Sequence, residues 1–225
     1  MLIEDFADKN LKNKSVGVEN PTWIQCEQSP IFEEDEAGKI WWNKDGVKGI
    51  SYVGNTKWTD YEASIDFIMS GASANNVFEL LVRARPKSVS KLRGEYYYSF
   101  SMGTTSYNVF QCESSLVNDR RTGVNSGKFT KSYADGSSHN LKIRVLDNKL
   151  SVYIDDTLLC DYTDTRAFKS LWGCVGIKTN GEGVKFSNLV VKKINDETGG
   201  DYDNFLGTGF DKPIQSWYNK IVLPE

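Results

Sequence analysis

The sequence has a single histidine, His139, and its four cysteines include no pair spaced C-x-x-C. A zinc site built from two or three histidines is therefore excluded. Any Ser-His-Asp or Cys-His mechanism would have to use His139. Cys112, Cys160 and Cys174 lie in strand-like segments, so we expect buried free thiols in preference to disulfides, and the same for Cys26.

Long apolar runs are also absent, since no stretch approaches the roughly 20 residues that a membrane span needs. The chain opens Met1-Leu2-Ile3-Glu4-Asp5, without the basic and then apolar leader of a secretory signal. Lys and Arg number 27 against 30 Asp and Glu, a net charge of -3, so the basic excess of a general nucleic-acid binder is missing. We expect a module of a larger secreted protein, outside the cell or at its surface, rather than an intracellular protein.

The dominant pattern is apolar alternation with a period of two, which is typical of strands. Residues 60–68 place Tyr61, Ala63, Ile65 and Phe67 on one face and Glu62, Ser64 and Asp66 on the other. Residues 77–85 and 139–146 alternate in the same way. Further strand candidates are 39–43, 48–53, 95–102, 107–112, 149–154, 157–161, 171–179 and 184–193. No long helical stripe interrupts them, so the pattern predicts an antiparallel all-β sandwich of jelly-roll type.

A change in composition near Asn195 divides the chain. Residues 1–194 carry the strand pattern and are expected to form one sandwich domain. Residues 195–204 are acidic and contain glycine, as linkers do, and residues 205–225 regain apolar side chains. We expect this C-terminal extension to pack on the sandwich.

Five segments resemble the concanavalin A-like and laminin-G-like jelly rolls. They are NTKWTDYEASIDFIM (55–69), FELLVRAR (78–85), EYYYSFSM (95–102), DGSSHNLKIRVLDNKLSVYIDDTLLCDYTD (135–164) and GCVGIKTNGEGVKFSNLVVKKI (173–194). Asp155-Asp156 stands where that family usually has an Asp-Gly turn. The resemblance implies a two-sheet antiparallel β-sandwich, most similar to bacterial carbohydrate-binding or glycosidase-associated modules.

Polar and aromatic residues suggest a sugar site on one sheet. If 77–85 pairs with 95–101, then Glu79, Arg83, Tyr97 and Ser99 share the face opposite the core. Arg and Glu provide planar hydrogen-bonding partners for sugar hydroxyls, and aromatic rings provide a platform for the apolar face of the sugar. The predicted ligand-binding set is Glu79, Arg83, Tyr97, Trp41, Trp42 and Trp172. The alternative, that these are ordinary solvent-facing strand residues, stays open.

Two further groups of residues carry weaker signals. Trp41 and Trp42 are adjacent, so at most one of them faces the core, and the other is stacked on a ligand or covered by residues 205–225. Arg120 and Arg121, with Lys128 and Lys131, are expected on a solvated basic loop, with contact to an acidic polysaccharide as the alternative.

Catalysis by paired carboxylates needs two acids about 5.5 Å or 6.5–9.5 Å apart. The string Glu62-Ala63-Ser64-Ile65-Asp66 lacks the central acid and the second glutamate of the laminarinase-type members of the fold. We therefore expect no catalytic residues. If the chain is an enzyme, Glu79 with Glu62 or Asp66 is the candidate acid/base pair. His139, at the entrance of a strand, is expected to be structural.

Acidic residues near the end of the chain, including Asp201 and Asp203, resemble a fragment of a calcium loop, although solvated linker is the preferred interpretation. The resemblance also implies a structural calcium ion, and no other cofactor is expected.

The leading hypothesis is a non-catalytic module that binds a polysaccharide or oligosaccharide. It would belong to a bacterial polysaccharide-degrading enzyme or surface protein, as a monomer or as part of a larger multidomain protein. The alternatives are a glycoside hydrolase or polysaccharide lyase of the same fold, and a protein-binding adhesion domain.

Overall fold

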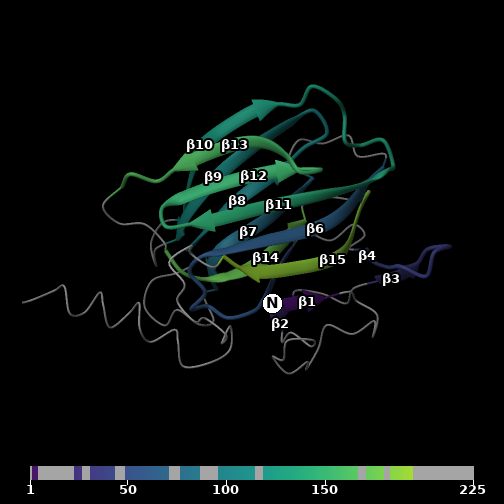
Figure 1. Cartoon of the computed structure of the whole chain (residues 1–225), viewed down its shortest axis with the longest axis horizontal. Helices are drawn as coiled ribbons and strands as arrows, with labels where there is room; N and C mark the ends of the chain where they lie inside the picture. Colours follow the sequence, from purple (N-terminus) through teal and green to yellow (C-terminus); the bar gives the residue numbers. More distant parts are fainter. Residues whose placement is uncertain are drawn as a thin grey trace, which may run out of the picture.

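The computed structural model describes residues 2–4, 23–26, 31–43, 49–70, 77–86, 96–114, 119–166, 171–179 and 183–194. All regular structure in these ranges is β, arranged as two antiparallel sheets stacked face to face (Figure 1). The two-sheet sandwich predicted from the alternation is confirmed. Among these residues no helix could serve as a membrane span.

The first sheet has the strand order β13-β12-β11-β6-β15-β4-β3, with β1 paired to β15. Its strands are β1 (Leu2–Glu4), β3 (Ile31–Glu34), β4 (Ile40–Asn43), β6 (Tyr61–Met69), β11 (Ser138–Leu146), β12 (Lys149–Ile154), β13 (Thr157–Thr163) and β15 (Val184–Lys193). Strict alternation along β6 buries every second side chain, from Tyr61 to Met69. The polar residues between them form the outer face of this sheet.

The second sheet has the order β10-β9-β8-β7-β14-β5-β2. Its strands are β2 (Trp23–Cys26), β5 (Gly49–Val53), β7 (Phe78–Arg85), β8 (Tyr96–Met102), β9 (Ser106–Ser114), β10 (Asp119–Lys128) and β14 (Cys174–Thr179). At one side of the sandwich β10 of the second sheet lies beside β13 of the first (Figure 1).

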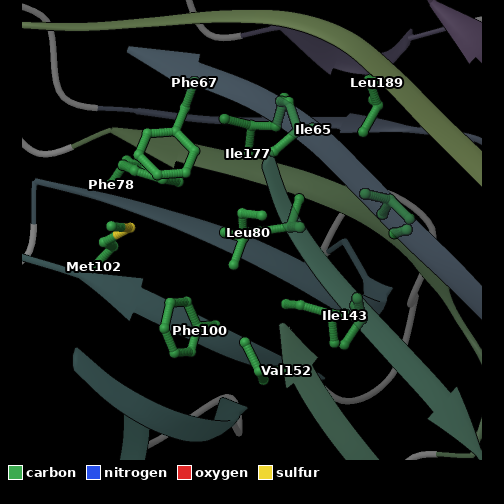
Figure 2. Close-up of a cluster of buried hydrophobic side chains, with 14 of the residues drawn as sticks. Ile65, Phe67, Phe78, Leu80, Phe100, Met102, Ile143, Val152, Ile177 and Leu189 are labelled. Atoms are coloured by element: carbon green, nitrogen blue, oxygen red, sulfur yellow. The ribbon is translucent and has the colours of Figure 1, made fainter. Parts of the chain in front are cut away.

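The core lies between the two sheets, where apolar side chains from both interdigitate (Figure 2). Phe67 from the first sheet packs on Phe78 from the second, with ring centroids 5.2 Å apart. The labelled residues Ile65, Phe67, Phe78, Leu80, Phe100, Met102, Ile143, Val152, Ile177 and Leu189 are all buried. Burial of this apolar surface is the main stabilising contribution, at about 25 cal/mol per Å².

Strand β10 is the main departure from the sequence prediction, which placed Arg120 and Arg121 on a loop. The strand reads DRRTGVNSGK and pairs with β9 from Asp119 to Lys128, with a bulge between Gly123 and Asn125. It has no apolar alternation because it is an edge strand that contributes little to the core. The short strands β1, β2 and β3 were also not predicted.

The cysteines Cys112, Cys160 and Cys174 are free and buried, as expected. Burial raises the pKa of the Cys160 thiol to about 12, and it raises the pKa of Cys174 as well. The side chain of Cys26 and the whole of residues 195–225, with Asp201 and Asp203, lie outside the described residues.

Candidate functional site

The outer face of the second sheet collects polar and aromatic side chains from five neighbouring strands. The pairing of β7 with β8 and β14 puts Glu79 opposite both Ser101 and Lys178. The pairing of β9 with β8 and β10 puts Cys112 opposite both Tyr97 and Arg121. Because side chains alternate along a strand, these residues all point away from the core. Ser99 and Phe110 occupy the next outward positions and are themselves paired.

Arg121 lies flat across this face. Its Cζ atom is 3.7 Å from the centroid of the Phe110 ring on β9. Its Nη2 atom is 2.8 Å from Oε2 of Glu79 on β7. Since β9 and β8 separate β10 from β7, the side chains of Arg121 and Glu79 together span both strands. The outward residues of β8 along this path, Ser99 and Ser101, are small enough to leave room for it.

Glu79 anchors Arg121 electrostatically. Its carboxylate is fully buried and meets Arg121 at 2.8 Å and Lys178 at 3.4 Å. A buried carboxylate is tolerated only when it is paired, so the two cations are held in place by the need to compensate it. Arg121 and Lys178 keep 30% and 22% of their side-chain surface exposed. The arrangement therefore fixes two cations at the surface above a carboxylate that a ligand cannot reach.

A second cluster of buried apolar side chains, separate from the main core, lies on the outer face of the second sheet. Tyr97 is 4% exposed and packs in a cluster with Leu81, Cys112 and Cys174. Burial is the main cause that raises the pKa of its hydroxyl. The Ser99 hydroxyl is buried and has no hydrogen-bond partner among the described residues. Glu79, Tyr97 and Ser99 thus share one face, as the sequence predicted, but they lie beneath Arg121 and Phe110 rather than at the surface.

Arg83 leaves this face, contrary to the sequence prediction. It adopts a positive φ of 50° at an irregularity in the pairing of β7 with β8. Its guanidinium donates to the Thr59 carbonyl at 3.2 Å, to the Asp60 carboxylate at 3.0 Å and to the Asp147 carbonyl. Arg83 is only 3% exposed and joins the end of β7 to the segments that flank β6 and β11.

The predicted tryptophan platforms lie elsewhere. Trp41, on β4 of the first sheet, is buried, donates its indole N–H to Asp35 at 2.8 Å and has Lys39 4.4 Å from its ring centroid. Trp42 pairs with Phe186 of β15, but its side chain is outside the described residues.

Trp172, just before β14, has 43% of its surface exposed. The guanidinium of Arg85 lies between the two aromatic rings of Trp172 and Tyr96, at 4.7 Å and 4.4 Å from their centroids. Among the predicted platforms, Trp172 is the one whose described side chain presents a substantial surface to a ligand.

The carboxylates suggested as a catalytic pair are not brought together. Glu79 is on the outer face of the second sheet, whereas Glu62 and Asp66 are on the outer face of the first, with the core between them. Asp66 is occupied by Lys39 and Asn140, both at 2.7 Å, and by Asn188 at 3.3 Å. The geometry that two-carboxylate hydrolysis requires is therefore missing for Glu79 with either partner.

His139 has both ring nitrogens engaged within the fold. Nδ1 lies 2.8 Å from Asp155 and Nε2 lies 3.2 Å from Asp135. The ring packs between Phe67 and Tyr133. These contacts fit the structural role expected for it. In the described part of the chain, no group of three or more His, Cys, Asp or Glu side chains could hold a metal ion.

Phe110 was not in the predicted binding set, and Arg121 was named only in a basic loop for which contact with an acidic polysaccharide was the alternative. Phe110 sits in a predicted strand, but its outward position depends on the register of β9, which the sequence does not reveal. Arg121 was assigned to a loop because β10 lacks apolar alternation. The only sequence signal that could have found it is the rule that an exposed edge strand carries charge.

Residues 37–194 match the family described as the C-terminal lectin domain of galactocerebrosidase. No curated protein matches the sequence significantly. Many solved structures share the fold, among them the following three. Carbohydrate-binding module CBM66 from Bacillus subtilis is 14% identical, with a TM-score of 0.52 over 77% of this chain and 95% of that one.

A protein of unknown function with a galectin-like fold, also from Bacillus subtilis, is 9% identical, with a TM-score of 0.54 over 73% of this chain and 87% of that one. Domain 4 of the extracellular arabinanase AbnA from Geobacillus stearothermophilus, solved with arabinotriose, is 12% identical. Its TM-score is 0.53 over 85% of this chain and 91% of that one. At these identities the likeness establishes the fold, which is a jelly-roll sandwich of the lectin and carbohydrate-binding-module type.

Proposed function

Because this chain belongs to the family of galactocerebrosidase C-terminal lectin domains, we propose that it binds carbohydrate on the outer face of its second sheet. The observation that carries the proposal is the fixed position of Arg121, stacked on Phe110 and paired with Glu79. A donor that is already held in place loses little conformational freedom on binding, so more of its interaction energy appears as affinity.

The two exposed groups suit the two chemical surfaces of a sugar. The guanidinium of Arg121 presents planar N–H donors that bind adjacent sugar oxygens in a bidentate manner. The part of the Phe110 ring that Arg121 leaves exposed offers an apolar contact beside the guanidinium. Glu79 is a positioning residue that acts through Arg121, and Lys178 adds a second donor at the far side of Glu79.

Two structural neighbours support a saccharide ligand, since one is a carbohydrate-binding module and the other is an arabinanase domain solved with arabinotriose. The chain then serves as a non-catalytic module of a bacterial polysaccharide-degrading enzyme or surface protein. Its place is outside the cell, either on its own or within a longer protein. The separation of Glu79 from Glu62 and Asp66 favours binding over hydrolysis.

A glycan microarray tests the proposal with the full 225-residue chain. Arg121→Ala and Phe110→Ala are expected to lower binding at least tenfold, because each removes a group that contacts the sugar directly. Arg144→Ala is the matched control, since Arg144 is an exposed cation on the outer face of the first sheet, opposite Glu62. Binding to no glycan by the folded wild type would overturn the proposal and favour protein adhesion.

A further inference from the structure

The outer face of the second sheet holds two cations around one carboxylate. Arg121 and Lys178 approach different oxygens of Glu79, at 2.8 Å and 3.4 Å. A single negative charge balances only one of them. We infer that this face selects saccharides carrying an anionic group, a carboxylate or a sulfate ester, over neutral sugars. The inference rests on the proposed function and names the ligand class of the same site.

The exposure of the three groups decides which charge a ligand meets. The Glu79 carboxylate has no exposed surface, whereas Arg121 keeps 30% and Lys178 keeps 22%. Interactions between charges are strengthened where water is partly excluded, as it is beside a buried carboxylate. A ligand approaching this face therefore meets the two cations, and the anion that partly compensates them is beneath.

A third cation lies on the outer face of the second sheet. By register with Ser106, Lys128 also occupies an outward position on β10, and it is exposed. By register with Ser114, Asp119 takes the outward position at the other end of β10. The charged residues of this face on β7, β10 and β14 are thus Arg121, Lys128 and Lys178 against Glu79 and Asp119. The chain as a whole has a net charge of -3. A cationic face on an acidic protein indicates an anionic partner for that face.

The geometry of Arg121 fits an oxyanion. Guanidinium groups form paired hydrogen bonds with carboxylate and sulfate oxygens, and these are stronger than hydrogen bonds to neutral hydroxyls. A neutral sugar would bind the same donors but would leave the second cation uncompensated.

The test compares matched ligands by isothermal titration calorimetry with the full chain. The probes are a hexuronate oligosaccharide and its carboxyl-reduced neutral counterpart, and a sulfated hexose oligosaccharide with its desulfated counterpart. The wild type is expected to bind at least one charged member ten times or more as tightly as its neutral counterpart. Raising NaCl from about 50 mM to about 500 mM should weaken the charged complex selectively, because salt screens exposed charges.

Four variants locate the effect. Arg121→Gln and Lys178→Gln should each remove most of the preference for the charged member, whereas Arg144→Gln on the other sheet should preserve it. Arg121→Lys keeps the charge and loses the bidentate geometry, so it should retain the salt dependence at lower affinity. This variant also separates loss of binding from loss of folding.

The outcomes distinguish the inference from the proposed function. Equal affinity for charged and neutral members, with both lost in Arg121→Gln, would overturn the inference and leave the proposed function standing. A charged preference that survives in both Arg121→Gln and Lys178→Gln would also overturn it. Binding of none of the four probes, together with no binding on the microarray, would overturn the proposed function itself. The preferred pair of probes tells whether the anionic group is a carboxylate or a sulfate.

Discussion

The Nη2 atom of Arg83 lies 3.0 Å from Oδ1 of Asp60, and the same Asp60 oxygen accepts the backbone N–H of Asp147 at 2.8 Å. Asp60 thus connects β7 of the second sheet with the turn between β11 and β12 of the first. The positive φ of Arg83 swings the guanidinium away from the outer face and into this contact. Arg83, which the sequence predicted to contact the ligand, instead links the two sheets.

We expect Arg83→Ala to lower the free energy of unfolding by about 3 kcal/mol. The half-buried Asp60 carboxylate would lose its counter-charge and keep only the Asp147 N–H, and the Thr59 and Asp147 carbonyls would lose the Arg83 donor. Urea denaturation measures the loss. Saccharide binding, measured under conditions where the variant is folded, should be unchanged. Loss of binding at unchanged stability would instead support the sequence-based assignment of Arg83 to the ligand site.

Gly173 packs against the backbone of Arg83. A Cβ atom added to Gly173 would lie 2.1 Å from the carbonyl carbon of Arg83, and the φ angle of Gly173 is +151°. Gly173→Ala should therefore destabilise the fold by more than about 3 kcal/mol, since backbone atoms cannot move aside as side chains do.

Gly136 is the matched control for this change, because its φ is +80° and nothing lies within 4 Å of an added Cβ. Gly136→Ala should lose only about 1 kcal/mol, the penalty of the backbone conformation itself. Thermal unfolding of Gly173→Ala and Gly136→Ala measures the loss of stability in each variant. Similar losses in the two variants would show that the close approach of Gly173 to Arg83 is unimportant.

Most of the sandwich follows from the alternation along the chain, and most of the site does not. The alternation of apolar residues in 60–68, 77–85 and 139–146 predicts β6, β7 and β11, because each of these strands buries one face against the core. Arg83 departs from its predicted face because a local change of φ reverses the side chain without leaving a mark in the pattern. Arg121 depends on a strand without apolar residues and on a contact with Glu79 three strands away. Such cross-strand contacts are set by register and curvature, which a single sequence does not encode in a visible period.

Asp164 should make stability depend on pH. Burial raises its pKa, but hydrogen bonds from Arg166 and Tyr98 outweigh this and hold the pKa at about 2, below the ordinary 3.8. The stabilisation is therefore present above about pH 4 and is lost as the pH falls through about 2. Because Arg166 is partly exposed to solvent, we expect about 1 to 2 kcal/mol.

Unfolding free energies measured between pH 4 and pH 2 test this, with Asp164→Asn as the comparison. The variant should be less stable at neutral pH and should show a shallower decline across this window. Parallel pH profiles of the wild type and the variant would contradict the low pKa of Asp164.

The buried thiols should be unreactive in the folded protein. With the pKa of Cys160 at about 12, only about one thiol in ten thousand is ionised at pH 8, and the thiolate is the reactive form. In a Cys26→Ser background, we expect a disulfide reagent to modify almost no thiol natively and all three after denaturation. Rapid native modification of Cys112, Cys160 or Cys174 would show that these residues open locally.

Trp172 lies just before β14, the strand that carries Lys178. It precedes Lys178 by six residues, which corresponds to roughly 20 Å of extended chain, so a short ligand cannot contact both. If its exposed indole stacks on the same saccharide, Trp172→Ala should weaken binding of long oligosaccharides several-fold and leave disaccharide binding unchanged. The measurement is the affinity for oligosaccharides of increasing length from one glycan. Phe110→Ala is the comparison, because loss of Phe110 should weaken binding of oligosaccharides of every length. An unchanged affinity of Trp172→Ala for the longest glycan would exclude Trp172 from the binding surface and confine recognition to the region around Arg121.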